Sequence, residues 1–246
     1  MSGPFGARHL DPYNLRHDAL QRVIYHQGIT DQTLSERAYG AIRGMITRLE
    51  LAPGDVVREE ALQRQLGIGR TPIREALQRL ARDQFVTVMP RRGMLVSSID
   101  VSELSLLFET RAVMEPYAAR LACMRGTDAD WADMARVIDA AATTAGDEAL
   151  LGVDRRCHEM IWNAAGNRFL TDTLDVLYAQ SDRVWHMYLA DVADTRHAVD
   201  EHAGILELLR AGDADRAAAR LEAHVKSFDA QVRAAVTRRL HPPLAV

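Results

Sequence analysis

Apolar residues recur at helical spacing through most of the chain. The first such pattern covers about residues 33–49 and is typical of an amphipathic helix. Thr33 and Glu36 stand at the spacing of a capping box, which predicts a helix start here. The segment APGD then ends the helix with a Pro-Gly turn. The expected buried positions are Ala38, Ile42, Met45, Ile46 and Leu49.

Two shorter helical patterns follow. The first runs from about Arg58 to Leu66, and Gly67 suits the left-handed backbone that stops a helix. The second begins at Thr71, which we expect to act as the N-cap, with Pro72 in the first turn. Its buried stripe is expected to be Ile73, Ala76, Leu77 and Leu80.

Strand periodicity occurs in one segment, FVTVMPRRGMLVSSI. It predicts a strand over about residues 85–88, a turn over residues 90–93 and a second strand over about residues 94–97. Three helices followed by a two-stranded hairpin are the elements of a winged helix-turn-helix, which we assign to residues 33–98.

Beyond residue 100 the pattern is helical throughout. Residues 101–240 predict about six helices, with breaks near residues 126–127, 146, 166–167, 193–194 and 212–213. Residues 1–32 have weak periodicity and are expected to form an N-terminal arm. The predicted fold class is therefore mainly α, with an N-terminal winged helix-turn-helix and a C-terminal all-α bundle of about six helices.

Composition limits the cellular setting. The 246 residues include two cysteines, too few for a disulfide framework. The chain has no apolar run of about 18 residues and no signal-peptide pattern at its start, so we expect a cytoplasmic protein without a membrane partner.

Charge is unevenly distributed over a chain whose net charge is −4. Residues 33–99 hold eleven arginines against seven acids, a balance of +4. Residues 100–246 hold sixteen basic and twenty-four acidic residues, a balance of −8. A basic module joined to an acidic one is typical of a polyanion-binding domain attached to a second domain.

The basic residues lie where a winged helix-turn-helix meets DNA. The second helix of the motif enters the major groove, and Arg70 and Arg74 stand four residues apart at its start, away from the buried stripe. Arginine binds guanine or phosphate through two N–H groups at once. Thr71 is expected to help hold a phosphate, and Arg91 and Arg92 at the hairpin tip to reach the backbone or the minor groove. A solvated surface would explain any single arginine, but the four together favour double-stranded DNA.

Three helices of the second half each turn a histidine inward. Asp154 and His158 stand at i and i+4 on one helix face, and His202 and His224 lie on later apolar stripes. Imidazoles with a carboxylate suit a divalent transition metal ion such as zinc, nickel, iron or manganese. The alternative is a set of hydrogen-bonded core histidines without a metal.

The N-terminal half resembles a known family. The stretch PGDVVREEALQRQLGIGRTPIREALQRLARDQFVTVMPRRGMLV is similar to the DNA-binding domain of GntR-type bacterial transcriptional regulators. This resemblance implies that Arg70, Thr71 and Arg74 contact DNA and that Gly93 shapes the wing. Gly69 departs from the family, which usually has serine or threonine at that position.

The helical half resembles the FadR-type C-terminal ligand-binding domain, the FCD domain, over about residues 101–240. The most similar segments are FETRAVMEPYAARLA and DEHAGILELLRAGDADRAAARLEAHV. Members that bind metal use Asp-x-x-x-His and two later histidines, which fall here on Asp154, His158, His202 and His224. Cys157 stands where the family usually has an aromatic residue.

The same resemblance points Arg111 into a ligand cavity, where its guanidinium would bind a small organic acid. An ion pair with Glu115, four residues on, is the alternative. Arg183 and His186 are further candidates for effector binding. The helix that carries Arg111 is expected to turn one apolar set inward: Leu106, Val113, Met114 and Ala118.

Together these features predict a transcriptional regulator that is not an enzyme. It is expected to bind its operator as a homodimer, under the control of a carboxylic acid bound at the metal site. Two alternatives are a metalloenzyme fused to a DNA-binding module and a regulator whose metal-free bundle serves only for dimerisation.

Overall fold

The computed structural model describes residues 32–144, 146–188 and 195–240. These residues form two compact units, one of residues 32–42 and 58–80, and the other of residues 43–57 and 81 onwards. The N-terminal arm predicted for residues 1–32 lies outside the described residues except for Gln32.

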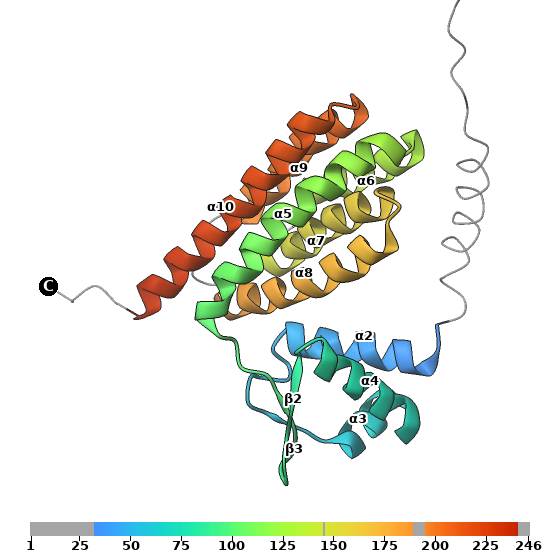
Figure 1. The fold of residues 1–246 in the computed structure, drawn as a ribbon, viewed down its shortest axis with the longest axis vertical. Coiled ribbons are helices and arrows are strands. Elements are labelled where there is room, and N and C mark those ends of the chain that lie inside the picture. The colour runs from blue at the N-terminus through green and yellow to red at the C-terminus, as the bar shows by residue number, and fades with distance from the viewer. Residues whose placement is uncertain (1–31, 145, 189–194, 241–246) are drawn as a thin grey trace, which may run out of the picture. The chain divides into compact units, whose positions relative to one another are not determined.

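The first unit is helical (Figure 1). It holds α3 (Glu59–Leu66) and most of α2 (Leu34–Thr47) and of α4 (Arg70–Arg82). The predicted capping box of α2 is confirmed, since the Thr33 backbone N–H donates to Glu36 Oε2 at 2.8 Å and the Glu36 backbone N–H donates to Thr33 Oγ1 at 3.2 Å.

The start of α4 differs from the prediction by one residue. Gly67 ends α3 with φ 65°, as expected, and α4 then begins at Arg70. Thr71 therefore lies inside the first turn, and its assignment as the N-cap is wrong. The predicted buried stripe of α4 is confirmed at Ile73, Ala76, Leu77 and Leu80.

The second unit contains the end of α2 and a small antiparallel sheet of three strands, β1 (Val56–Val57), β2 (Val86–Met89) and β3 (Gly93–Val96). The strand order is β1-β3-β2, and the predicted hairpin pairs Val86 with Val96 and Met89 with Gly93. The turn has positive φ at Arg91 and Gly93, of 66° and 84°. Strand β1 was not predicted, because two residues are too few to show alternation.

A helical bundle makes up the rest of the second unit, and the prediction of about six helices is confirmed (Figure 1). Helix α5 packs against α7, α8 and α10, and α9 packs against α6, α7 and α10. No helix among the described residues is long and apolar enough to cross a membrane. The six helices are α5 (Val101–Arg125), α6 (Asp128–Ala141), α7 (Asp147–Ala164), α8 (Arg168–Tyr188), α9 (Thr195–Arg210) and α10 (Ala214–Leu240).

The inward face of α5 differs from the one predicted. Leu106 and Val113 are exposed, whereas Arg111 and Glu115 are buried together with the expected Ala118. Apolar residues lie on two opposite sides of this helix, so their spacing alone does not reveal which side packs into the core. The Arg111–Glu115 ion pair therefore lies on the core side of α5, and the apolar side with Leu106 and Val113 is exposed to solvent.

Candidate metal centre and nucleic-acid interface

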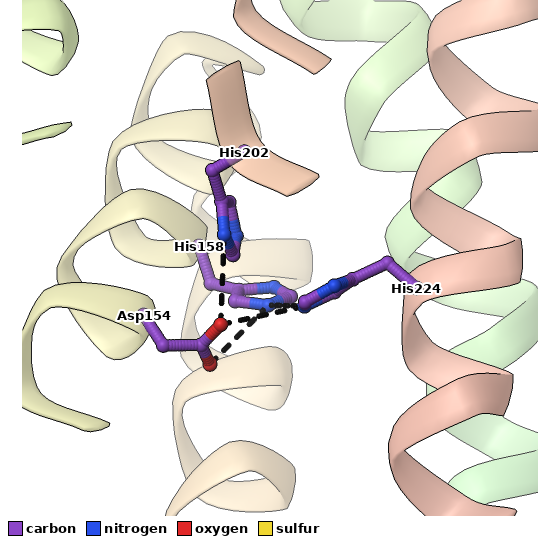
Figure 2. A group of neighbouring side chains, drawn as sticks. All are labelled: Asp154, His158, His202 and His224. Carbon is purple, nitrogen blue, oxygen red and sulfur yellow. Dashed lines mark hydrogen bonds and ion pairs between the residues drawn. The ribbon is translucent and has the colours of Figure 1, made fainter. Parts of the chain in front are cut away.

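Four side chains from three helices meet inside the bundle (Figure 2). Asp154 and His158 come from α7, His202 from α9 and His224 from α10, and all four are buried. One ligand atom from each lies within 4.8 Å of the others. The predicted grouping of these four residues is therefore present in the fold.

The candidate metal-binding side chain of each helix points inward because it lies within an apolar stripe. On α7, Leu151, Ile161 and Trp162 are buried on the same side as the Asp154–His158 pair. On α9, Ile205, Leu206 and Leu209 are buried with His202, and on α10, Leu221, Val225 and Phe228 are buried with His224. The core packing of the bundle thus positions the four candidate ligands.

The donor atoms have the spacing of a coordination shell. His158 Nε2 lies 3.2 Å from His224 Nε2 and 3.7 Å from Asp154 Oδ2. Asp154 Oδ1 lies 3.4 Å from His224 Nε2. Donor atoms around a tetrahedral ion with bonds of about 2.1 Å lie roughly 3.4 Å apart. The printed distances for Asp154, His158 and His224 are therefore close to those of a coordination shell, and a bound ion would draw the full set, now within 4.8 Å, closer together.

Outer hydrogen bonds engage Nδ1 of all three histidines of the cluster. The Nδ1–H of His158 donates to Glu115 Oε2 at 2.5 Å, and that of His224 donates to Glu201 Oε2 at 2.8 Å. The Nδ1–H of His202 donates to the carbonyl oxygen of Ala198 at 3.0 Å. With Nδ1 engaged in this way, Nε2 is the nitrogen of each ring left to bind a metal once the ring is neutral.

Two buried acceptors of the cluster have no hydrogen-bond partner, Asp154 Oδ1 and His202 Nε2. The other carboxylate oxygen, Asp154 Oδ2, accepts from the Tyr178 hydroxyl at 2.6 Å. A buried acceptor without a partner costs about 1–3 kcal/mol, and a bound cation removes that cost. These two unpaired acceptors are the observation that supports a metal ion at this site.

The electrostatics favour metal binding at Asp154 and His202 but oppose it at His224. Burial would lower the pKa of His224, but the carboxylates of Asp154 and Glu201 raise it to about 9, so a metal must displace a proton from this ring. Burial by itself raises the pKa of Asp154, but the three neighbouring histidines hold it well below its usual range. Burial, together with the charge of His224, lowers the pKa of His202 to about 3. Asp154 is therefore ionised and His202 neutral near pH 7, as metal binding requires.

The predicted DNA contacts lie on exposed surface. Arg70 and Arg74 extend from the first turn of α4 and share a face, since Nε of each lies near Glu59 of α3, at 3.7 and 3.1 Å. Glu59 is a partner that the sequence pattern did not reveal. Thr71, and also Arg91, Arg92 and Gly93 in the hairpin turn, are exposed as expected.

Comparisons with known proteins match both halves of the chain. Residues 34–96 match the family of bacterial regulatory proteins, gntR family, and residues 106–227 match the FCD domain. The Nta operon transcriptional regulator of Aminobacter aminovorans is 31% identical over 190 residues, which cover 75% of this chain and 88% of the relative. The chain belongs to the GntR family.

Other relatives are also regulators. The HTH-type transcriptional repressor RspR of Escherichia coli is 23% identical over 205 residues, covering 82% of this chain and 90% of the relative. The solved structure of E. coli McbR/YncC has the same fold, with a TM-score of 0.75, 21% identity and coverage of 83% of this chain and 99% of the other. The GntR-family chain is thus a transcriptional regulator rather than an enzyme, and the metalloenzyme alternative is excluded.

Arg111 of this GntR-family regulator lies next to the cluster. Its Nε donates to Glu115 Oε1 at 2.6 Å, so the ion pair considered as an alternative is present. Its guanidinium carbon lies 4.6 Å from the centre of the Tyr178 ring. One buried nitrogen, NH1, has no hydrogen-bond partner. The ion pair therefore leaves one donor of Arg111 available, and its contact with an effector stays a prediction.

The two other effector candidates lie on α8 of the GntR-family chain. Arg183 is buried and donates to Gln180 Oε1 at 3.2 Å, and burial lowers its pKa to about 10. His186 is partly buried, and its Nδ1 donates to the Asp182 carbonyl oxygen at 2.9 Å. No hydrogen bond described for either side chain reaches the four-residue cluster, so their role also stays a prediction.

Three residues of the GntR-family site were missed in the sequence. Glu115 was considered only as a partner of Arg111, and Glu201, which also lies 3.8 Å from the exposed His197, was given no role. Tyr178 was not considered at all. Each acts across helices, and spacing within one helix cannot reveal such a contact. Glu201 directly precedes His202. Because adjacent residues of a helix point to different sides, this position did not predict that Glu201 contacts the histidine cluster.

Proposed function

We propose that this GntR-family regulator binds double-stranded operator DNA as a homodimer in the cytoplasm. A small carboxylic acid, bound beside a divalent transition metal ion in the FCD domain, controls that binding. The observation that carries the proposal is the buried cluster, in which three imidazoles have Nδ1 engaged and two acceptors, Asp154 Oδ1 and His202 Nε2, have no partner.

Asp154, His158, His202 and His224 would hold the ion. Nitrogen and oxygen donors of this kind suit zinc, nickel, iron or manganese. When bound, the ion supplies a Lewis-acidic centre for an anionic oxygen of the effector. Glu115, Glu201 and the Ala198 carbonyl orient the imidazoles, and the Tyr178 hydroxyl orients the carboxylate.

Arg111 would bind the carboxylate of the effector. A guanidinium has five N–H donors in a fixed plane, and Glu115 accepts from only one side of it. The unpartnered NH1 is the donor left for a ligand. Arg183 and His186 would line the same cavity from an adjacent face.

The DNA contacts divide into two kinds. Arg70 and Arg74 would read base edges in the major groove and so give specificity. Thr71, Arg91 and Arg92 would bind phosphates and position the protein, with Gly93 providing the sharp turn at the hairpin tip. In the free protein Glu59 forms ion pairs with both Arg70 and Arg74, and DNA must replace those contacts.

Control by the effector requires two arrangements of the dimer with different affinity for the ligand. The four metal ligands come from three helices, so a bound ion joins α7, α9 and α10. Arg111 adds α5 to the same group. An effector held by both the ion and Arg111 would therefore favour the arrangement in which these four helices are closest.

Metal content and thermal stability test the proposal. The parent, dialysed against buffer without metal, is expected to retain about one ion per chain, and added zinc or nickel to raise its melting temperature. His202→Ala is expected to lose the ion, whereas His197→Ala, a variant of an exposed histidine on the same helix, is expected to keep it. A parent free of metal and insensitive to added zinc, nickel or manganese would support the metal-free alternative instead.

Effector chemistry is tested on the metal-loaded protein. A thermal-shift screen of sugar acids, hydroxy acids, dicarboxylates and fatty acids is expected to give hits that also change operator affinity. The same compounds should have no effect on the Asp154→Ala/His158→Ala protein. Hits that are all neutral or cationic would contradict the proposed role of Arg111.

A further inference from the structure

Arg111 lies against a group of aromatic rings in the bundle core. Its guanidinium carbon is 5.7 Å from the centre of the Phe108 ring and 6.0 Å from that of Phe228. The Trp185 ring is centred 3.8 Å from that of Phe228, and the centres of Phe108 and Phe228 are 5.9 Å apart. All three rings are buried, and we refer to Phe108, Trp185 and Phe228 as the aromatic group. Helices α5, α8 and α10 thus each place one aromatic side chain near the candidate effector arginine.

A second large core cluster of the bundle is mostly aliphatic. Its buried members include Met134, Ile161, Ile205 and Leu221, and Trp131 is the one aromatic ring among the buried residues described for it. Helix packing in this bundle therefore does not require an aromatic group. Aromatic rings attract further rings in offset or edge-to-face contacts. A ligand that binds beside Arg111 would gain more from an aromatic ring than from an aliphatic chain of the same size.

Two buried donors in this part of the core have no hydrogen-bond partner, Arg111 NH1 and Trp185 Nε1. Both side chains lie beside the Phe228 ring, so one small molecule can reach both donors. Buried N–H groups in folded proteins nearly always have an acceptor, because the contact with water that they lose must be replaced. Trp162 Nε1 and Arg183 Nε also have no partner, but these side chains lie outside the aromatic group. The core around the aromatic group thus lacks two acceptors that a ligand can supply.

The two donors require acceptors of different charge. Arg111 is a cation, and a carboxylate is the acceptor that matches it. Trp185 is neutral and belongs to a core cluster with Leu104, Val225 and Val232. A carboxylate buried among these apolar side chains would lose its hydration without gaining a partner of opposite charge. An ether or carbonyl oxygen avoids that cost, because it accepts from the indole N–H without carrying a charge.

We propose that the effector is an aromatic monocarboxylic acid with a neutral oxygen at the far end of its ring. The carboxylate accepts from Arg111 NH1, the ring packs against Phe108 and Phe228, and the neutral oxygen accepts from Trp185 Nε1. Trp185 is then a residue that determines effector specificity. This inference rests on the proposed control by a carboxylic acid and narrows the chemical class of that acid.

The first test compares related acids by isothermal titration calorimetry on the full-length protein with added zinc. The reference is 4-methoxybenzoate, which has the carboxylate, the ring and the neutral oxygen. 4-Ethylbenzoate keeps its shape but lacks the acceptor, and is expected to bind about tenfold more weakly. Terephthalate puts a second carboxylate at the same place, and trans-4-methoxycyclohexanecarboxylate replaces the aromatic ring. Each of these two is also expected to bind at least tenfold more weakly than 4-methoxybenzoate.

The second test assigns the preference for the oxygen to Trp185. Trp185→Phe keeps an aromatic ring but removes the N–H, so it is expected to bind 4-methoxybenzoate and 4-ethylbenzoate equally, within about twofold. Trp131→Phe loses the same atoms from the aliphatic cluster and is expected to keep the tenfold preference. Circular dichroism shows whether each variant is folded. If Trp185→Phe does not fold, the ligand series on the parent decides alone.

The outcomes separate this inference from the proposed function. Equal binding of 4-methoxybenzoate and 4-ethylbenzoate by the parent, or a tenfold preference that persists in Trp185→Phe, overturns the role of Trp185. Tighter binding of the cyclohexane acid or of terephthalate overturns the aromatic monocarboxylic class. Both results leave control by a carboxylic acid standing. Binding of the neutral 4-methoxybenzamide as tightly as the acid overturns this inference and the proposed role of Arg111 together. If no acid of the series binds, this inference is overturned, and the wider screen of carboxylic acids decides the proposed function.

Discussion

Glu115 joins the candidate effector arginine to the candidate metal ligand. Its Oε2 accepts from His158 Nδ1 at 2.5 Å, and its Oε1 accepts from Arg111 Nε at 2.6 Å. Burial would raise the pKa of this carboxyl, but Arg111 and His158 hold it at about 2, so Glu115 is ionised. One buried carboxylate thus orients both groups, so a ligand that moves Arg111 would change the electrostatic surroundings of the carboxylate that holds His158.

Glu115→Gln is expected to lower metal affinity about 10–100-fold, the usual effect of losing the outer partner of a ligating histidine. The neutral amide cannot hold the Nδ1–H of His158 and the Arg111 guanidinium as strongly as a carboxylate does. Competition with a chromophoric chelator measures this change. Glu207→Gln, an exposed position on α9, is the matched control, and equal affinities of the two variants would contradict the positioning role.

Tyr178→Phe is expected to destabilise the metal-free protein by about 1–3 kcal/mol, because Asp154 Oδ2 loses its hydrogen-bond donor while it stays buried. Urea unfolding with and without saturating zinc is the measurement. The loss should be smaller with zinc, since a cation compensates the same carboxylate. A loss of equal size in both conditions would indicate that Tyr178 acts only through packing.

Arg74→Ala is expected to weaken binding to the cognate operator by about 1–3 kcal/mol and to relax the base preference at one position. Arg92→Ala should instead weaken binding evenly across sequences and reduce the salt slope by about one, as expected for a phosphate contact. Fluorescence anisotropy over a salt series on cognate and scrambled sites distinguishes the two. Equal affinity of Arg74→Ala and the parent for the operator would contradict base reading by Arg74.

His186 is expected to make stability depend on pH. The hydrogen bond to Asp182 raises the pKa of His186 above its ordinary value, with further help from the charge of Glu148. The folded state therefore binds the proton more tightly, and the stabilisation is present below about pH 6.5 and fades as pH rises through the folded-state pKa.

The measurement is the free energy of unfolding of the parent and of His186→Gln. The parent is expected to be more stable by about 1–2 kcal/mol at pH 5.5, with a smaller difference at pH 9. A difference that grows with pH would mean that Asp182 does not stabilise the charged imidazole.

Sequence reasoning predicted features that depend on one helix or one turn. The capping box at Thr33, the left-handed Gly67, the stripe of α4 and the inward phase of Asp154 and His158 all follow from local spacing, and the structure has each of them. The six helices of the bundle were also predicted, since glycine and polar residues mark their ends.

Features that depend on packing between elements were missed or misplaced. Strand β1 exists because β3 offers it an edge, and its two residues carry no pattern of their own. The phase of α5 was wrong because Leu106 and Val113 are as apolar as the residues that do enter the core. Glu201 reaches His224 across 23 positions of sequence, and only the packing of α9 against α10 brings the two together.

The four candidate ligands are synthesised at different times as the chain is made. Asp154 and His158 are the first of the four to be synthesised, and His224 follows 66 residues after His158, on α10. A nascent chain therefore cannot hold an ion with the full set until this helix has been made and has packed against α5 and α9. If the ion is needed for effector binding, the new chain could then respond to an effector only after α10 has packed into the bundle.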